Sequence, residues 1–194
     1  MKKIITIIFL LNLVVSNANS IEAEVFVQST VNRASEILSK NISKEEKMNG
    51  LKTIARETVD IRGVGFYSLG ATRKFLNDNQ KQIYFGLFEN YFLKSFSSRL
   101  SEYTNPKIKV QSKKILNKNY TIVNSVLVST PDRPEVKIDW RIYTKNPDDP
   151  LIRDLIIEGL SLARTQKEEF ASILNSNDGD INALFKTLEE FSKN

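Results

Sequence analysis

The sequence predicts an α+β domain, because the spacing of its apolar residues changes twice along the chain. Before Pro106 apolar residues recur every three or four positions, as on helices, and between about 107 and 162 they recur every second position, as on strands. Helical spacing returns after residue 162. Short polar segments separate the strands, which favours antiparallel neighbours in a meander. We therefore expect N-terminal helices, a curved four-stranded antiparallel meander and C-terminal helices.

Residues 1–20 have the pattern of a cleavable signal peptide. Lys2 and Lys3 precede a nearly wholly apolar run over residues 4–15, and small residues at 18–20 suit cleavage. The run is too short for a membrane-spanning helix, which needs about 20 apolar residues. The chain has no cysteine, so neither a lipidation site nor a disulfide is expected. Residues 21–194 should then form a single domain that is soluble in the periplasm.

Capping residues mark the helices of the N-terminal half. Helical spacing begins over residues 21–40, Ser43 with Glu46 predicts the start of a second helix, and Asn77 with Gln80 predicts a long helix over 78–103. Aromatic residues cover more than half of the long helix, so it must be covered on several sides. Its aromatic residues are Tyr84, Phe85, Phe88, Tyr91, Phe92, Phe96 and Tyr103. The glycines of segment 63–70 predict turns between short helical pieces, either as plain chain reversals or as a hinge.

Four strands are expected over residues 107–116, 120–130, 135–144 and 151–162, followed by helices over about 165–175 and 180–193. The third strand alternates strictly. One face carries Val136, Ile138, Trp140 and Ile142, and the other carries Lys137, Asp139, Arg141 and Tyr143. Gly159 within the last strand predicts a bulge that would turn Ile157, Leu160 and Leu162 toward the interior. This sheet offers a large apolar surface and little chemistry.

The composition argues against catalysis. The chain has no histidine and no cysteine, which removes the usual general base, the common nucleophile arrangements and the best ligands for transition metals. We expect no cofactor and no metal. An alternative is a small cone-shaped α+β enzyme that uses Asp139 or Glu158 as an acid or base. The ordinary interpretation is cross-strand ion pairing for Asp139, and a structural role at the bulge for Glu158 together with Ser161.

A basic hairpin holds much of the positive charge. Its residues are Lys107, Lys109, Lys113, Lys114 and Lys118. Such lysines commonly guard the edge of a sheet, and they could also attract an acidic partner or anionic lipid. One basic hairpin is too small a footprint for a nucleic-acid-binding protein.

Three motifs resemble the MlaC family of periplasmic phospholipid-binding proteins, also known as the toluene-tolerance auxiliary family. They are K-I-D-W-R-I-Y from residue 137, D-L-I-I-E-G-L-S-L from residue 154 and E-E-F-A-S-I-L from residue 168, and the pairs Val59-Asp60 and Leu69-Gly70 precede them in the family order. The chain departs from the family where Gly70 is followed by Ala71-Thr72-Arg73 and where the helix reads Thr165-Gln166-Lys167. A headgroup role for an arginine of that helix is therefore not carried over.

The resemblance implies a soluble periplasmic phospholipid carrier rather than an enzyme. It implies transfer of a glycerophospholipid between an outer-membrane lipoprotein complex and the substrate-binding ring of an inner-membrane ABC transporter, in a direction that it does not reveal. A two-chain lipid has on the order of 30 methylenes, each worth about 0.8 kcal/mol on burial, so a carrier needs an enclosed apolar cavity.

The expected cavity lies between the sheet and the long helix. Its lining residues are Leu87, Tyr91, Val126, Val136, Ile138, Trp140, Ile142, Ile157, Leu160 and Leu162. Two alternatives remain at this point. The same residues could form an ordinary core, which the residues alone favour, or the protein could be a carrier or chaperone for exported apolar segments.

Overall fold

The computed structural model describes residues 22–193, so the signal peptide predicted for residues 1–20 lies outside the described residues. The N-terminal helices come first, followed by the sheet and two last helices. The helices are α1 (Ala23–Ser39), α2 (Lys44–Thr58), α3 (Ile61–Ser68), the 3₁₀ turn η1 (Thr72–Lys74), α4 (Asp78–Leu100), α5 (Leu162–Asn175) and α6 (Ile181–Lys193). The strands are β1 (Ile108–Asn117), β2 (Tyr120–Leu127), β3 (Val136–Tyr143), β4 (Leu151–Ile157) and β5 (Leu160–Ser161). The predicted α+β class is confirmed.

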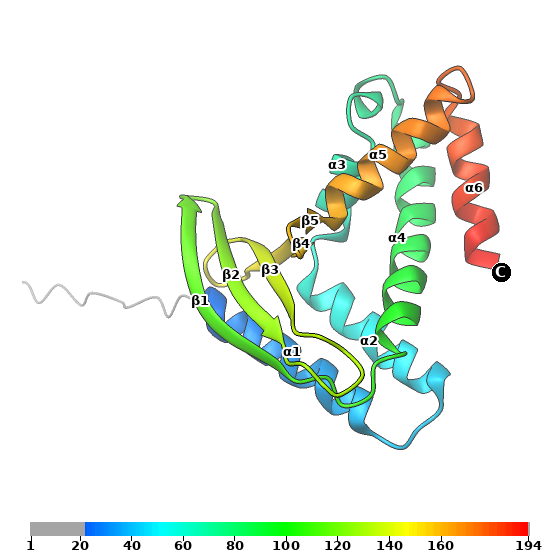
Figure 1. The fold of residues 1–194 in the computed structure, drawn as a ribbon. Coiled ribbons are helices and arrows are strands. Elements are labelled where there is room, and N and C mark those ends of the chain that lie inside the picture. Colours follow the sequence, from blue (N-terminus) through cyan, green and yellow to red (C-terminus); the bar gives the residue numbers. More distant parts are fainter. Residues whose placement is uncertain (1–21, 194) are drawn as a thin grey trace, which may run out of the picture.

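Strands β1 and β2 and the last helix, α6, lie at opposite sides of the molecule (Figure 1). Helix α1 packs along β1 and β2, while α4, α5 and α6 form a separate helical layer. Helix α2 contacts both α1 and α4, and α3 contacts β4 as well as α4 and α5. Helix α2 therefore joins α1 to the helical layer, and α3 and α5, which both contact β4, join the layer to the sheet.

Both predicted capping boxes are confirmed. The Ser43 hydroxyl accepts a hydrogen bond from the Glu46 backbone at 3.2 Å, and the Glu46 carboxylate accepts one from the Ser43 backbone at 2.9 Å. Asn77 and Gln80 form the same pair of bonds at 2.9 and 3.0 Å. Each pair satisfies two backbone N–H groups that the first turn leaves without intrahelical partners, which fixes where α2 and α4 begin.

The sheet is an antiparallel meander of five strands in the order β1-β2-β3-β4-β5. The predicted bulge at Gly159 is wrong. Glu158 and Gly159 both have positive φ, at 48° and 84°, and form a two-residue turn that reverses the chain between Ile157 and Leu160. Two positive φ values match the twist that a tight hairpin requires. The predicted strand over 151–162 is therefore the hairpin of β4 and β5.

One apolar cluster, here called the sheet cluster, lies between α1 and the sheet. It combines Val27 and Val31 of α1 with buried strand residues that include Trp140 and Ile142. The Trp140 indole donates a hydrogen bond to the Ser125 hydroxyl at 2.8 Å, so this buried N–H group has a partner. Sequence alternation therefore places the Trp140 face of β3 correctly against an apolar layer.

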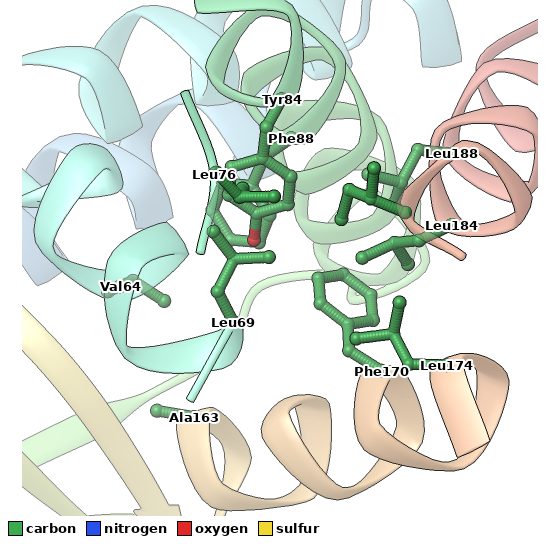
Figure 2. Packing of buried hydrophobic residues seen from close by; sticks show 11 residues of the cluster. Val64, Leu69, Leu76, Tyr84, Phe88, Ala163, Phe170, Leu174, Leu184 and Leu188 are labelled. Atoms are coloured by element: carbon green, nitrogen blue, oxygen red, sulfur yellow. The ribbon is translucent and has the colours of Figure 1, made fainter. Parts of the chain in front are cut away.

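The second cluster, here called the helical cluster, lies among α3, α4, α5 and α6. Figure 2 shows Tyr84 and Phe88 of α4 beside Phe170 of α5 and Leu184 of α6. Phe170 meets the Tyr84 and Phe88 rings edge-on, at centroid distances of 6.4 and 6.1 Å. The broad apolar surface of α4 is thus covered from several sides, as predicted.

The glycines of segment 63–70 do not all break the chain into turns. Gly63 and Gly65 lie within helix α3, and a Cβ at Gly65 would meet Phe88 at 2.8 Å. Gly65 is therefore needed for close packing against α4, and its carbonyl also accepts a hydrogen bond from the Tyr84 hydroxyl at 2.9 Å. Gly70 alone of the three has positive φ, at 57°. The prediction of turns at Gly63 and Gly65 is wrong.

The two clusters meet at the junction of α2, α3 and β4. Val59 packs against both clusters and forms a parallel bridge with Ile152. Next to it, the Arg153 guanidinium pairs with Asp60 at 2.6 Å and donates a hydrogen bond to the Tyr120 hydroxyl at 2.6 Å. Asp60 also accepts a hydrogen bond from the Gly63 backbone at 2.8 Å, which caps α3. One carboxylate therefore ties the start of α3 to the sheet.

Candidate functional site

The residues predicted to line one cavity do not lie together, because some belong to the sheet cluster, some to the helical cluster and some to neither. Ile138, Trp140 and Ile142 are buried in the sheet cluster, where α1 packs against them. Leu87 and Tyr91 are half-buried and pack against the helical cluster instead. In this structure the buried sheet residues behave as ordinary core, which is the alternative that the sequence left open.

Tyr91 connects α4 to α5. Its hydroxyl group donates a hydrogen bond to the Gln166 side chain at 2.9 Å, and its ring lies 4.8 Å from that of Phe191. Burial raises the pKa of the Tyr91 hydroxyl, so the group stays neutral over the physiological range. Gln166 lies one helical turn after Leu162, so this bond is close to the start of α5.

Val126 faces away from the other predicted sheet residues. It pairs with Lys137, whereas its neighbour Ser125 pairs with Ile138, and directly paired residues share a face. Val126 therefore lies on the sheet face opposite Trp140, although it is buried. The prediction that it shares a face with Trp140 is wrong.

An apolar patch with accessible side chains lies at one end of the sheet. Ile157 pairs with both Ile138 and Leu160, and Val136 precedes Ile138 by two residues, so all of these share the Trp140 face. Val136 and Ile157 are half-buried, while Leu160 is 59% exposed and Leu162, the first residue of α5, is 41% exposed. We call Val136, Ile157, Leu160 and Leu162 the end patch.

The expected inward orientation of Leu160 and Leu162 is wrong. The Glu158-Gly159 turn sends the chain back along β4 after Ile157, so β5 is a two-residue strand at the edge of the sheet that residues 22–193 form. A bulge would have continued the strand into the interior, whereas the turn leaves these two leucines at the surface. Exposure does not contradict the predicted contact of these two leucines with lipid, which stays a prediction.

Asp154 fixes the position of the end patch relative to α5. Its buried carboxylate accepts hydrogen bonds from the Ser161 hydroxyl at 2.6 Å and from the Ala163 backbone at 3.0 Å. Ser161 in turn accepts a hydrogen bond from the Arg164 backbone at 3.1 Å and caps the helix. These bonds explain the spacing of Asp154, Gly159 and Ser161 in the D-L-I-I-E-G-L-S-L motif, since the turn brings the serine back to the aspartate.

The two carboxylates considered for acid–base chemistry have structural partners. Asp139 accepts a hydrogen bond from the Asn124 amide at 2.8 Å, and Glu158 accepts one from the Lys137 backbone. The expected ion pairing of Asp139 is replaced by this amide contact, and Arg141 instead lies 3.7 Å from Asp154. Within residues 22–193 no group of three His, Cys, Asp or Glu side chains is placed to hold a metal ion.

One lysine of the basic hairpin is engaged in ion pairs that the sequence did not predict. Lys113 forms ion pairs with Glu22 and Glu24 at the start of α1. These contacts, first with Glu22 and then with Glu24, raise the pKa of Lys113. The lysine therefore anchors β1 to α1, which sequence reasoning missed because the partners are some ninety positions away.

Two open depressions lie elsewhere on the surface. One lies between α3 and α4 and is bordered by Ile61, Arg62 and Phe85, with the Arg62 guanidinium 4.4 Å from the Phe85 ring centroid. The other runs along the exposed side of α1. Neither is lined by any of the ten residues predicted to bind lipid. Within the described part of the chain, no helix is both long and apolar enough to span a bilayer.

Comparison with known proteins identifies the family. A family model described as the MlaC protein matches residues 28–190, which is most of the chain, and this protein therefore belongs to the MlaC family. The resemblance seen in the three motifs is confirmed. No curated protein sequence matches the chain.

A solved structure shares the fold. It is the phospholipid-binding protein from Ralstonia solanacearum in complex with a phospholipid, with a TM-score of 0.75 and 17% sequence identity. The similarity covers 89% of this chain and 98% of that chain. The arrangement of the sheet and the helices is thus shared with a protein whose structure contains a phospholipid.

Proposed function

We propose that this protein is a soluble phospholipid carrier that holds acyl chains against its apolar side chains. The observation that carries the proposal is the MlaC family match over residues 28–190. Further support comes from the shared fold of a phospholipid-binding protein whose structure contains a phospholipid. The end patch adds a local reason, because it leaves leucine side chains accessible beside a buried apolar layer.

The ten residues predicted to bind lipid differ in how they would reach a ligand. Leu160 and Leu162 are accessible without any movement, and Val136 and Ile157 are partly so. Ile138, Trp140 and Ile142 are covered by α1, and Val126 is buried on the opposite sheet face, so these four residues would contact lipid only if the elements around them move. We place first contact at the end patch and deeper acyl-chain burial between the sheet cluster and the helical cluster.

The size of the ligand supports such an opening. A two-chain lipid contains on the order of 30 methylenes, at about 0.8 kcal/mol each, and four side chains at a surface shield a small part of them. The remaining burial energy favours any conformation that exposes more apolar protein surface to the chains. The two clusters are separate and both contact Val59, so parting them there would leave the packing inside each cluster intact.

The family membership supports a place between two membranes. We propose a periplasmic protein that exchanges phospholipid with an outer-membrane lipoprotein complex and with the substrate-binding ring of an inner-membrane ABC transporter. The remaining hairpin lysines would speed encounters with acidic partner surfaces, since exposed charges act mainly on association rate. We propose a non-enzymatic role because both candidate carboxylates are engaged in structural hydrogen bonds.

Native mass spectrometry of protein purified without detergent tests the carrier function. The expected result is a co-purified mass that fits a glycerophospholipid. Leu160→Glu should lower the bound fraction, because an ionised carboxylate against acyl chains lacks a partner. Ile115→Glu is the matched control, since Ile115 is an apolar strand residue that is 71% exposed and lies on the outer strand β1.

The outcomes separate the alternatives. A protein that is consistently empty, also after incubation with phospholipid vesicles, would contradict the carrier function. Equal lipid loading of Leu160→Glu and Ile115→Glu would be consistent with the carrier function but would show that Leu160 does not contact the lipid. Co-purified peptide in place of lipid would indicate the carrier of exported apolar segments.

A further inference from the structure

The connection between α3 and α4 displays an aromatic side chain to solvent. Phe75 is 82% exposed, whereas Leu69 and Leu76 near the two ends of this connection are buried in the helical cluster. Gly70 reverses the chain with positive φ, and the 3₁₀ turn η1 follows, with the Phe75 backbone donating to Thr72 at 3.0 Å. The connection is therefore anchored at both ends and holds Phe75 outward.

Cationic residues lie in the same connection as this aromatic residue and next to its Gly70 end. Arg73 and Lys74 precede it, and the sequence from 66 to 77 contains no acidic residue. Arg73 donates a hydrogen bond to the Phe66 carbonyl at 3.3 Å, which keeps its guanidinium beside α3. The Lys167 ammonium lies 5.4 Å from the centroid of the Tyr67 ring, and Tyr67 is 40% exposed. We call Tyr67, Arg73, Lys74, Phe75 and Lys167 the Phe75 tip.

Single exposed apolar side chains are common on proteins, so the exposure of Phe75 alone is weak evidence for a binding surface. The combination of an exposed aromatic side chain with neighbouring cations is more specific. An aromatic side chain that projects from an anchored turn, with cations beside it, matches the two attractions of a membrane surface: apolar burial below the headgroups and positive charge among anionic headgroups. Tyr67 adds a ring with a polar end, which suits the same boundary.

We propose that the Phe75 tip docks the protein on anionic phospholipid bilayers, with Phe75 inserted at the boundary between headgroups and acyl chains. Arg73, Lys74 and Lys167 then lie at the level of the phosphates. Docking would be shallow and reversible, because one aromatic side chain and three cations give far less membrane affinity than a spanning helix. This inference goes beyond the proposed carrier function and does not depend on it, since surface docking and bound lipid are measured separately.

The test uses the full-length mature protein and vesicles of phosphatidylglycerol and phosphatidylcholine in equal parts. The wild type should co-sediment with these vesicles, and less so with phosphatidylcholine alone or at high salt. Phe75→Ser should weaken the partition coefficient about tenfold, from the apolar burial that it loses. The double variant Arg73→Glu with Lys74→Glu should weaken it at least about 25-fold, since each cation near an anionic surface contributes about fivefold. Ile115→Ser, at a similarly exposed position near other lysines, should change nothing.

The absence of cysteine allows a second measurement. Phe75→Cys and Ile115→Cys each introduce a unique thiol that can carry an environment-sensitive fluorophore. The label at position 75 should shift to shorter wavelength when anionic vesicles are added, and the label at position 115 should not. A wild type that ignores anionic vesicles overturns the proposal, and so does equal binding by Phe75→Ser. Binding that appears only after a membrane protein is added to the vesicles would assign the tip to a protein partner instead and would overturn it too.

Discussion

Replacing Asp154 by alanine should unfold the connection between the sheet and α5. The carboxylate is 5% exposed, and it accepts hydrogen bonds from the Ser161 hydroxyl and the Ala163 backbone. Alanine would leave the buried Ala163 N–H and the half-buried Ser161 hydroxyl without this acceptor, and would leave Arg141 without its carboxylate partner at 3.7 Å. Losing the acceptor costs more than the bonds themselves stabilise, because the orphaned donors are still removed from water.

The expected magnitude follows from these two bonds. Hydrogen bonds to a charged group contribute about 1.5–3 kcal/mol each, and they share one acceptor, so we expect a loss of about 4 kcal/mol. For a domain of this size a loss of about 4 kcal/mol lowers Tm by roughly 8–16 °C. Asp154→Asn keeps one acceptor oxygen and the side-chain shape, so it should cost about half as much. Asp139→Ala is the matched control, because that half-buried carboxylate loses one bond, from Asn124, at a cost of about 1 kcal/mol.

Thermal and urea unfolding of Asp154→Ala, Ser161→Ala and the double variant measure the coupling. If the two side chains stabilise the structure through their mutual bond, the double variant should cost at least about 1 kcal/mol less than the sum of the single variants. Additivity within about 0.5 kcal/mol would refute the reasoning, as would an Asp154→Ala protein no less stable than Asp139→Ala.

Three further predictions concern the helical cluster. Gly65→Ala should lower stability by about 1 kcal/mol in urea unfolding, because the new Cβ would stand 2.8 Å from the Phe88 ring and the overpacking outweighs the gain in helix propensity; a more stable variant would contradict the packing role. Leu184→Ala should cost about 2–5 kcal/mol by the same measurement, since the side chain is fully buried, and a loss below about 1 kcal/mol would contradict the packing of α6. Burial raises the pKa of Tyr84 above its unfolded value, so its contribution to stability is complete below about pH 10 and is lost as pH rises above that value. Unfolding free energies of Tyr84→Phe and the wild type should therefore diverge above pH 10, and parallel pH profiles would contradict this assignment.

Local signals in the sequence were enough to predict most of the element order. The pairs Ser43 with Glu46 and Asn77 with Gln80 act within one helical turn, so their residue types alone fix the starts of α2 and α4. The strict alternation of β3 likewise needs no partner to be recognised. These features hold in the structure, where each capping bond joins residues of the same helical turn.

The misassigned features depend on distant partners or on unusual local geometry. Gly65 could not be recognised as a packing glycine, because the ring that demands it belongs to Phe88 on another helix. The turn after Ile157 was obscured because Glu158 takes a left-handed conformation that side chains rarely adopt and that Asn or Asp adopts more readily.

The same limit applies to the candidate site. Strand β2 is apolar on both faces, so alternation gives no direction for Val126, and its face follows from the pairing with Lys137. The link from Arg153 to Asp60 and Tyr120 joins segments far apart in the chain, and no pattern within β4 indicates it. Register and long-range ion pairs are set by the assembled fold, which is why the predicted cavity residues could not be assigned to one site from the sequence.

The junction between the clusters makes their movements interdependent. Asp60 accepts hydrogen bonds from Arg153 of β4 and from the backbone that begins α3, so a shift of β4 acts directly on the cap of α3. Helix α3 in turn contacts α4 through the close approach of Gly65 to Phe88, with no space for a Cβ between them. Packed interiors transmit such shifts because they contain few voids to absorb them. The sheet therefore cannot move relative to the helical layer at this junction without also moving α3, and α3 carries the anchored turn that presents Phe75.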